Sequence, residues 1–269
     1  AHADSSRHER NIDASMAPDL AGKSLPESLA TGALPDAVAD KIGASVRVNL
    51  ITRDGGKGDG SGIITQVPGF GNTPVILTNA HVVMAAANPE EMTVSTVDGR
   101  TLPVSVLASG NLDGAVNGKG KILNPATLGA NDVAILTFEK AAATTRVCAV
   151  QTGFQKAGRP SSGFVVGSPK GVQPDEVRAI RTAGKEPLYM GGAMELGISP
   201  SSQKPVTASG SSGSGVLDHD GRLTALISSG NGRVSFKVTG EALKNFLEAA
   251  VQNQQELLPL VKHQARLGR

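Results

Sequence analysis

Cysteine is almost missing from this sequence, and its scarcity excludes several kinds of chemistry at once. The 269 residues contain one cysteine, Cys148, and no tryptophan. No internal disulfide can form, and no site with several cysteine ligands can hold a metal. Stability must therefore come from the packed core. Cys148 lies inside the apolar segment "RVCAV" and is interpreted as a small core residue rather than a nucleophile.

Charge of one sign and long apolar runs are also lacking. The formal net charge is +2, too small to indicate nucleic acid or an anionic membrane surface as the partner. No apolar run approaches the roughly 18 residues that a membrane-spanning helix needs. With 39% hydrophobic and 19% charged residues, the composition is that of an ordinary globular protein.

Glycine, in contrast, is abundant at 33 residues, and short segments with alternating apolar residues predict an all-β fold rich in turns. In the first half we expect strands in 44–51, 63–67, 74–83, 91–97, 101–109 and 131–139. In the second half we expect them in 146–152, 163–169, 176–184, 215–218, 222–230 and 233–240. Two runs of about six short strands each predict two small β-barrels in series.

These patterns divide the chain into four segments. Residues 1–43 are a polar arm with one or two short helical turns, 44–140 the first barrel and 141–238 the second. In 239–269, Thr239 can cap an amphipathic helix, and a polar to basic tail follows in which Pro259 stops the helix. The apolar stripe of that helix is Leu243, Phe246, Leu247, Ala250 and Val251.

Three short segments carry candidate chemistry. His81 is the only one of five histidines at the end of an apolar segment, "VILTNAHVV", where a buried ring needs a partner that a backbone carbonyl would also supply. Asp132 opens the apolar "DVAIL" and is either a strand-start residue or a charge with a dedicated partner. The segment "GSSGSG" (210–215) fits a linker or a tight turn, and the strand–turn–strand pattern after it favours the turn.

In this order, "LTNAHVV", "NDVAIL" and "GSSGSGVL" resemble the His, Asp and Ser motifs of chymotrypsin-fold serine proteases. The style is that of bacterial HtrA-type and glutamyl-endopeptidase-type enzymes, and "GDGSGIIT", "VVGSPKG" and "DHDGRLTALIS" agree with it. The resemblance covers roughly residues 44–250. It implies two six-stranded antiparallel β-barrels with a C-terminal α-helix, and a serine endopeptidase that works through an acyl-enzyme intermediate.

The resemblance also implies a role for each residue that matches the motifs. Ser212 is the nucleophile, with Ser211 or Ser214 as alternatives, His81 is the general base, and Asp132 fixes the imidazole tautomer. The N–H groups of Gly210 and Ser212 form the oxyanion hole. Ser211 stands where the family usually has Asp or Asn, so the activating ion pair of pancreatic-type zymogens is not expected.

Substrate binding is expected along residues 227–230. Ser228 matches the serine that supports the aspartate, and residues 228–230 would pair with the substrate backbone as a strand. The residues expected to bind substrate are Thr207, Ile227, Ser228, Ser229 and Gly230. Thr207 matches glutamyl-specific relatives, but Ile227 replaces their pocket histidine and no acidic residue stands at the pocket base. We therefore expect a small to medium apolar residue before the scissile bond.

Two loops have other interpretations. The segment "GGKGDGSG" (55–62) lacks the Gly-Lys-Ser/Thr ending of a phosphate loop and the final glutamate of a calcium loop, so it predicts a hairpin turn. In "DHDG" (218–221), two carboxylates and a histidine predict turn chemistry rather than a metal site. We expect no metal and no cofactor.

The expected partner is a protein or peptide substrate, and the oligomeric state stays open. The alternatives are a catalytically silent binding module and an esterase on the same fold. HtrA-type proteins carry a peptide-binding domain after the protease, and none is expected here because only residues 239–269 follow the second barrel. The single cysteine, the Ala-rich start and the bacterial-style motifs favour an exported bacterial enzyme, periplasmic or secreted, with the cytoplasm as the alternative.

Overall fold

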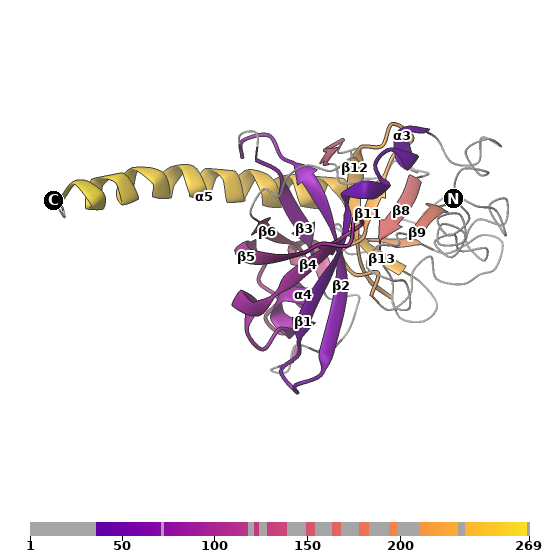
Figure 1. Cartoon of the computed structure of the whole chain (residues 1–269), viewed down its shortest axis with the longest axis horizontal. Coiled ribbons are helices and arrows are strands. Elements are labelled where there is room, and N and C mark those ends of the chain that lie inside the picture. The colour runs from indigo at the N-terminus through magenta and orange to yellow at the C-terminus, as the bar shows by residue number, and fades with distance from the viewer. Residues whose placement is uncertain are drawn as a thin grey trace.

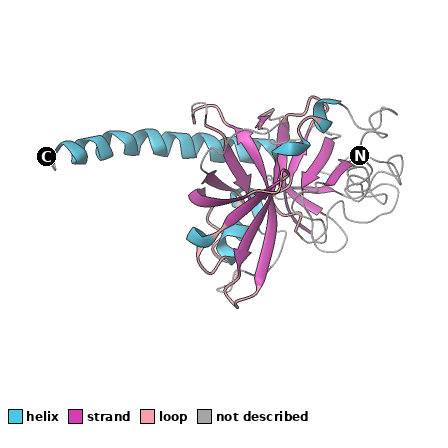
Figure 2. Ribbon diagram, in the orientation of Figure 1, coloured by secondary structure: helices cyan, strands magenta, loops and turns pink. Residues whose placement is uncertain are grey.

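Strands dominate the structure, and one long helix ends it (Figure 2). The computed structural model describes residues 36–70, 73–117, 121–123, 128–138, 149–153, 163–167, 178–182, 194–197, 210–230 and 235–267. The predictions for residues 1–35, Cys148, Thr207 and the side chains of the basic tail lie outside this part. The expected all-β class and the C-terminal helix are confirmed.

The first sheet is a closed barrel of six strands. Its members are β1 (Ser45–Ile51), β2 (Lys57–Gln66), β3 (Val75–Thr78), β4 (Thr93–Thr96), β5 (Thr101–Ser109) and β6 (Ala134–Phe138). They pair in the order β1-β4-β5-β6-β3-β2, and β2 pairs back with β1 to close the ring. The short β7 (Val150–Gln151) adds to β2 in parallel. Closure removes the free edges that an open sheet would expose.

Two segments of this barrel differ from the sequence prediction. The turn expected at 55–62 ends early because β2 begins at Lys57. Its glycines permit close packing, since a Cβ at Gly60 would lie 2.9 Å from Val82. The strand expected through residue 83 ends at Thr78, and the helix α4 (Ala80–Ala85) follows. Apolar residues fill this segment without a period, so periodicity cannot separate a buried strand from a buried helical turn.

The second half forms a six-stranded antiparallel sheet. Its members are β8 (Gly163–Gly167), β9 (Arg178–Thr182), β10 (Met194–Gly197), β11 (Gly215–Leu217), β12 (Leu223–Gly230) and β13 (Ser235–Val238). They pair in the order β10-β13-β12-β11-β8-β9. Strand β10 was not expected from the sequence, and the predicted strand at 146–152 contributes β7 to the first sheet instead.

One apolar cluster joins the two sheets. It contains Ile63 from β2 together with Phe164, Leu217 and Leu226 from the second sheet. Gly215 lets the sheets approach, since a Cβ there would lie 2.4 Å from the Cδ1 atom of Ile63. The shared core fixes the loops that meet along the junction, where the candidate site lies.

Residues 36–44 pack on this core, and 36–43 belong to the segment that the sequence predicts as a polar arm with short helical turns. They form α3 (Asp36–Ala39) and the short helix η2 (Ile42–Ala44). Val38 is fully buried in the shared cluster. Gly221, in the β11–β12 turn, faces α3 so closely that a Cβ would lie 2.3 Å from the Ala37 carbonyl oxygen.

Val38→Ala is expected to lower the free energy of unfolding by about 2 kcal/mol, because two buried methyl groups are lost from the core. Urea denaturation measures this as a lower midpoint. Asp36→Asn is the control, since Asp36 is exposed on the same helix, and its change should stay within about 0.5 kcal/mol. Equal midpoints for Val38→Ala and the wild type would show that α3 does not pack on the core.

The last helix, α5 (Gly240–Leu267), begins as the sequence predicts. The hydroxyl oxygen of Thr239 accepts a hydrogen bond from the Ala242 amide at 3.4 Å, and Leu243 and Leu247 are buried in the core. The prediction that Pro259 stops the helix is wrong, because α5 continues to Leu267 and extends beyond the body (Figure 1). Proline removes one backbone hydrogen bond, but every other residue added to a formed helix still gains one.

No described helix is long and apolar enough to cross a membrane.

Candidate active site

His81 lies at the start of α4, directly after β3 ends. Its backbone N–H, one of the first in the helix, has no partner inside the helix. The Asp132 carboxylate accepts a hydrogen bond from it at 3.0 Å. Asn79, the residue before the helix, makes no side-chain cap and instead donates from Nδ2 to the Asp132 carbonyl at 2.8 Å. Together these bonds fix β3, α4 and the segment before β6 relative to one another.

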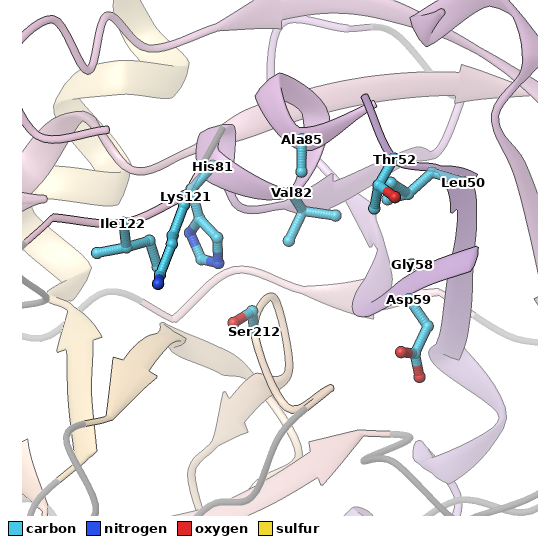
Figure 3. A pocket seen from close by; sticks show the side chains of 10 residues that line it. All are labelled: Leu50, Thr52, Gly58, Asp59, His81, Val82, Ala85, Lys121, Ile122 and Ser212. Carbon is cyan, nitrogen blue, oxygen red and sulfur yellow. The ribbon is translucent and has the colours of Figure 1, made fainter. Parts of the chain in front are cut away.

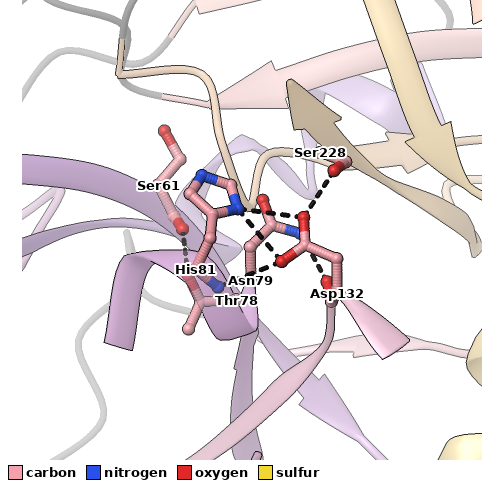
Figure 4. Close-up of polar contacts among 6 residues, drawn as sticks. All are labelled: Ser61, Thr78, Asn79, His81, Asp132 and Ser228. Carbon is pink, nitrogen blue, oxygen red and sulfur yellow. Dashed lines mark hydrogen bonds and ion pairs between the residues drawn. The ribbon is translucent and has the colours of Figure 1, made fainter. Parts of the chain in front are cut away.

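Asp132 is completely buried, and its carboxylate faces the imidazole of His81 (Figure 4). The His81 Nδ1 atom lies 2.9 Å from Oδ2 and 3.0 Å from Oδ1. The Ser228 hydroxyl, from β12 of the second sheet, also donates to Oδ2. An ionised carboxylate can only accept hydrogen bonds, so Nδ1 carries the proton and Nε2 of the neutral ring is left as an acceptor.

The pKa of Asp132 is lowered although burial acts in the opposite direction. Loss of hydration raises the pKa of this carboxyl, while the charge interaction with His81 lowers it. Hydrogen bonds from the His81 ring, from Ser228 and from the His81 backbone lower it further and outweigh the burial. The carboxylate is therefore kept ionised beside the imidazole, which stabilises a positive charge on that ring.

This lowered pKa predicts a stability loss in acid. The ionised form favours the folded state, so its stabilisation is complete above the unfolded pKa of about 3.9 and disappears as the pH falls through the lower folded pKa. We expect the free energy of unfolding to fall more steeply below about pH 4 for the wild type than for Asp132→Asn. Urea denaturation at several acid pH values tests this, and parallel curves for the two proteins would contradict it.

The candidate nucleophile stands in a turn between two glycines with left-handed backbone. Gly210 has φ +86° and Gly213 has φ +88°, values that residues other than glycine rarely adopt. At Gly213 a side chain is excluded twice, because a Cβ would also lie 2.0 Å from the Ser61 carbonyl oxygen. The segment is thus a packed turn rather than a linker.

The three serines of the turn have different surroundings. Ser211 and Ser214 are buried. Ser212 is half-buried and lines the same pocket as His81. Figure 3 shows the Nε2 edge of the His81 ring turned toward the Ser212 side chain. Of the three alternatives, Ser212 is the one that lines the pocket together with the His81 ring.

The N–H groups of the turn differ in whether a backbone carbonyl accepts a hydrogen bond from them. The Gly213 N–H donates to the Ile227 carbonyl at 2.8 Å and the Ser214 N–H to the Ser211 carbonyl at 2.9 Å. In the part of the chain that the structure describes, the N–H groups of Gly210 and Ser212 have no such acceptor. These are the two donors that the sequence analysis assigns to the oxyanion hole.

The pocket beside Ser212 has a volume of about 460 Å³. Apolar side chains from β1 and α4 form much of its wall, with a charged residue toward each end (Figure 3). Its lining residues are Leu50, Thr52, Gly58, Asp59, His81, Val82, Ala85, Lys121, Ile122 and Ser212. None of these except His81 and Ser212 was singled out from the sequence, because they come from four separate segments.

The residues expected to bind substrate lie on β12 and before the nucleophile turn. Ile227 is buried in a small cluster with Val165, Val216 and Ala225. Ser228 contacts Asp132, and Ser229 is buried with its hydroxyl unpaired among the described residues. Gly230 ends β12. Thr207, which is also expected to bind substrate, lies outside the described residues.

The segment "DHDG" forms the predicted turn between β11 and β12. The Asp218 carboxylate accepts hydrogen bonds from the N–H groups of Asp220 and Arg222, each at 2.9 Å. His219 packs edge-on against Phe164 with ring centroids 5.2 Å apart. Within the described ranges, no cluster of three or more potential ligands could hold a metal ion.

Comparisons with known proteins identify the family and support the fold. The family model of the trypsin-like peptidase domain matches residues 60–226, more than half of the chain. The serine endoprotease from Yersinia pestis is similar in structure, with a TM-score of 0.55 and 16% identity over 81% of this chain and 66% of its own, just under two thirds. A protease from M. tuberculosis in its active form has a TM-score of 0.52 and 17% identity over 81% of this chain and 84% of its own. No curated protein matches the chain.

Proposed function

Because the chain belongs to the trypsin-like peptidase domain family, we propose that it is a serine endopeptidase in which Ser212, His81 and Asp132 form the catalytic triad. The observation that carries the proposal is the hydrogen-bonded His81–Asp132 pair, whose imidazole shares a pocket with Ser212. The buried Asp132 carboxylate accepts hydrogen bonds from the His81 ring, the His81 backbone N–H and the Ser228 hydroxyl. A carboxylate fixed in this way can orient the imidazole as a general base requires.

The first half of the proposed reaction forms the acyl-enzyme. Nε2 of His81 removes the hydroxyl proton of Ser212 while Oγ attacks the carbonyl carbon of the scissile bond. The carbonyl oxygen becomes an anion and accepts hydrogen bonds from the N–H groups of Gly210 and Ser212. The protonated His81 then gives its proton to the leaving amine, the C–N bond breaks, and the acyl group stays on Ser212 as an ester.

The second half releases the acyl group. A water molecule takes the place of the amine, loses a proton to His81 and attacks the ester carbonyl. The same donors stabilise the second tetrahedral anion. Its collapse breaks the bond to Oγ, and the proton on His81 returns to Ser212. Asp132 stays ionised throughout and stabilises the charged imidazole in both halves.

The residue bound before the scissile bond is proposed to be small to medium and apolar, as the sequence predicts. The buried apolar cluster of Ile227 with Val165, Val216 and Ala225 supports this. We also propose that the sheet of β8 to β13 closes into the second barrel of the chymotrypsin fold. Cleavage of a peptide library measures the preference, and dominance of acidic or basic residues at that position would contradict it.

The mechanism is tested with a peptide substrate that releases a chromophore as its leaving amine. An acyl-enzyme predicts that an ester substrate with the same acyl group gives an initial burst of product, followed by slower turnover. Cleavage of both substrates supports the endopeptidase. Turnover of esters with no cleavage of any peptide would indicate an esterase, and turnover of neither would indicate a binding module.

A further inference from the structure

Ser61 is a buried residue of β2 that contacts the nucleophile turn at two carbonyl groups. Its backbone N–H donates to the Ser212 carbonyl at 2.7 Å, and its hydroxyl donates to the Gly210 carbonyl at 2.8 Å. Its own carbonyl accepts a hydrogen bond at 2.8 Å from Oγ1 of Thr78, which stands three residues before His81 (Figure 4). Ser61 thus connects the strand that precedes the base with the turn that carries the nucleophile.

Close approach between β2 and the turn makes these bonds possible. A Cβ at Gly213 would overlap the Ser61 carbonyl, and a Cβ at Gly60 would lie 3.4 Å from the Ser212 carbonyl oxygen. Behind Ser61, a Cβ at Gly167 would lie 3.2 Å from the Ser61 hydroxyl. The Ser61 residue is completely buried, so solvent water cannot readily replace its hydroxyl as the donor to Gly210.

Each hydrogen bond of the turn fixes the plane of one peptide group. The bond from the Ser214 N–H to the Ser211 carbonyl holds the 211–212 peptide. The 212–213 peptide is held at both ends, by the Ser61 N–H on its carbonyl and by the Ile227 carbonyl on its N–H. The 210–211 peptide is held at its carbonyl by the Ser61 hydroxyl.

The plane of the 210–211 peptide matters because it adjoins the N–H group of Gly210. The proposed function assigns one oxyanion donor to the N–H of Gly210, and the two dihedrals of Gly210 decide its direction relative to the 210–211 plane. Glycine rotates about both with little steric resistance. A donor that must turn into place during the reaction loses much of its advantage over water, whereas a fixed donor keeps it.

We propose that Ser61 is a positioning residue, whose hydroxyl holds Gly210 so that the Gly210 N–H stays directed at the oxyanion. This inference rests on the proposed function. The Ser61 hydroxyl acts on the oxyanion through the turn, by way of the Gly210 carbonyl. It stabilises the transition state, in which the oxyanion is charged, and hardly changes the stability of the bound substrate.

Ser61→Ala tests the proposal. We expect kcat for the peptide substrate to fall about tenfold with KM changed less than about twofold, because only an interaction of the charged state is weakened. A peptide aldehyde, which forms a tetrahedral adduct with the nucleophile, should bind about tenfold more weakly to the variant. The corresponding peptide amide, which binds without forming an adduct to a variant that also carries Ser212→Ala, should bind equally with and without Ser61→Ala.

Two further variants separate the hydrogen bond from packing. Ser61→Cys keeps a side chain of similar shape, but a thiol is a weak donor, so kcat should fall as it does in Ser61→Ala. Thr65→Val is the matched control, because it removes a buried hydroxyl from the same strand that donates to the Ile63 carbonyl at 3.2 Å, away from the turn. Its kcat should stay within about twofold of the wild type.

The outcomes distinguish the two proposals. A wild-type protein that cleaves no peptide and forms no aldehyde adduct contradicts the proposed function itself. An active wild type with unchanged kcat in Ser61→Ala overturns the positioning role alone. The role is also overturned if Ser61→Cys keeps full activity, or if Thr65→Val loses as much kcat as Ser61→Ala. Should Ser61→Ala fail to fold by circular dichroism, the Ser61→Cys result decides.

Discussion

Replacing Ser212 by alanine is expected to lower kcat for a peptide substrate by roughly a millionfold, the effect of removing the nucleophile in comparable sites. In the proposed mechanism the Ser212 hydroxyl is the group that attacks the carbonyl carbon, and alanine provides no nucleophile in its place. Binding of substrate should survive, since the turn keeps its backbone and its glycines. The measurement is the rate of leaving-group release at saturating substrate, with purified variant and wild type at equal concentration.

Ser214→Ala is the matched control for this change. Ser214 stands two residues away in the same turn, and its buried hydroxyl has no hydrogen-bond partner among the described residues. Its removal should therefore leave kcat within about twofold of the wild type. Peptide cleavage that survives Ser212→Ala and is lost in Ser214→Ala would show that Ser214, and not Ser212, is the nucleophile.

Asp132→Asn is expected to lower kcat by about ten-thousandfold while the protein stays folded. The side chain keeps its shape, but one carboxylate oxygen becomes an NH₂ group that donates hydrogen bonds. Donation to Nδ1 of His81 would favour the tautomer with its proton on Nε2, and that ring cannot accept the Ser212 proton. The variant also loses the negative charge that stabilises the imidazolium in the transition state.

Asp113→Asn makes the same chemical change outside the site. Asp113 is exposed, and its carboxylate accepts a hydrogen bond from Asn111 at 2.9 Å. Its kcat should match that of the wild type. If Asp132→Asn kept more than about a tenth of the wild-type kcat, the hydrogen bond from His81 to Asp132 would not be needed for catalysis.

Motif order and the family resemblance together select His81, Asp132 and Ser212 as candidates, since the local signal of each leaves a structural alternative open. An isolated titratable residue beside an apolar run needs a partner, and glycines beside a serine indicate a tight turn. The contact of Ser228 with Asp132 follows from the family resemblance. The hydrogen bonds of Asn79, Thr78 and Ser61 could not be predicted, since they depend on which carbonyl groups the folded strands bring within reach.

The fold was predictable where a period was clear and unpredictable where every residue is apolar. Strands β1 and β5 alternate and were located within a residue. In "AHVVMA" the apolar residues show no period, so the sequence predicts a strand through residue 83 where the structure has the start of α4. Proline gave a false stop in α5, because its cost is local whereas the helix adds a hydrogen bond at each later residue.

The most direct test of the catalytic site is covalent labelling with a fluorophosphonate, followed by digestion and mass spectrometry of the labelled peptide. We predict one adduct per chain, on Ser212, because the reagent reacts with a hydroxyl activated by the imidazole. The adduct should be absent in Ser212→Ala and form far more slowly in His81→Ala. An adduct on another residue, equal labelling rates in His81→Ala, or no adduct in a wild-type protein that still cleaves peptides would contradict this prediction.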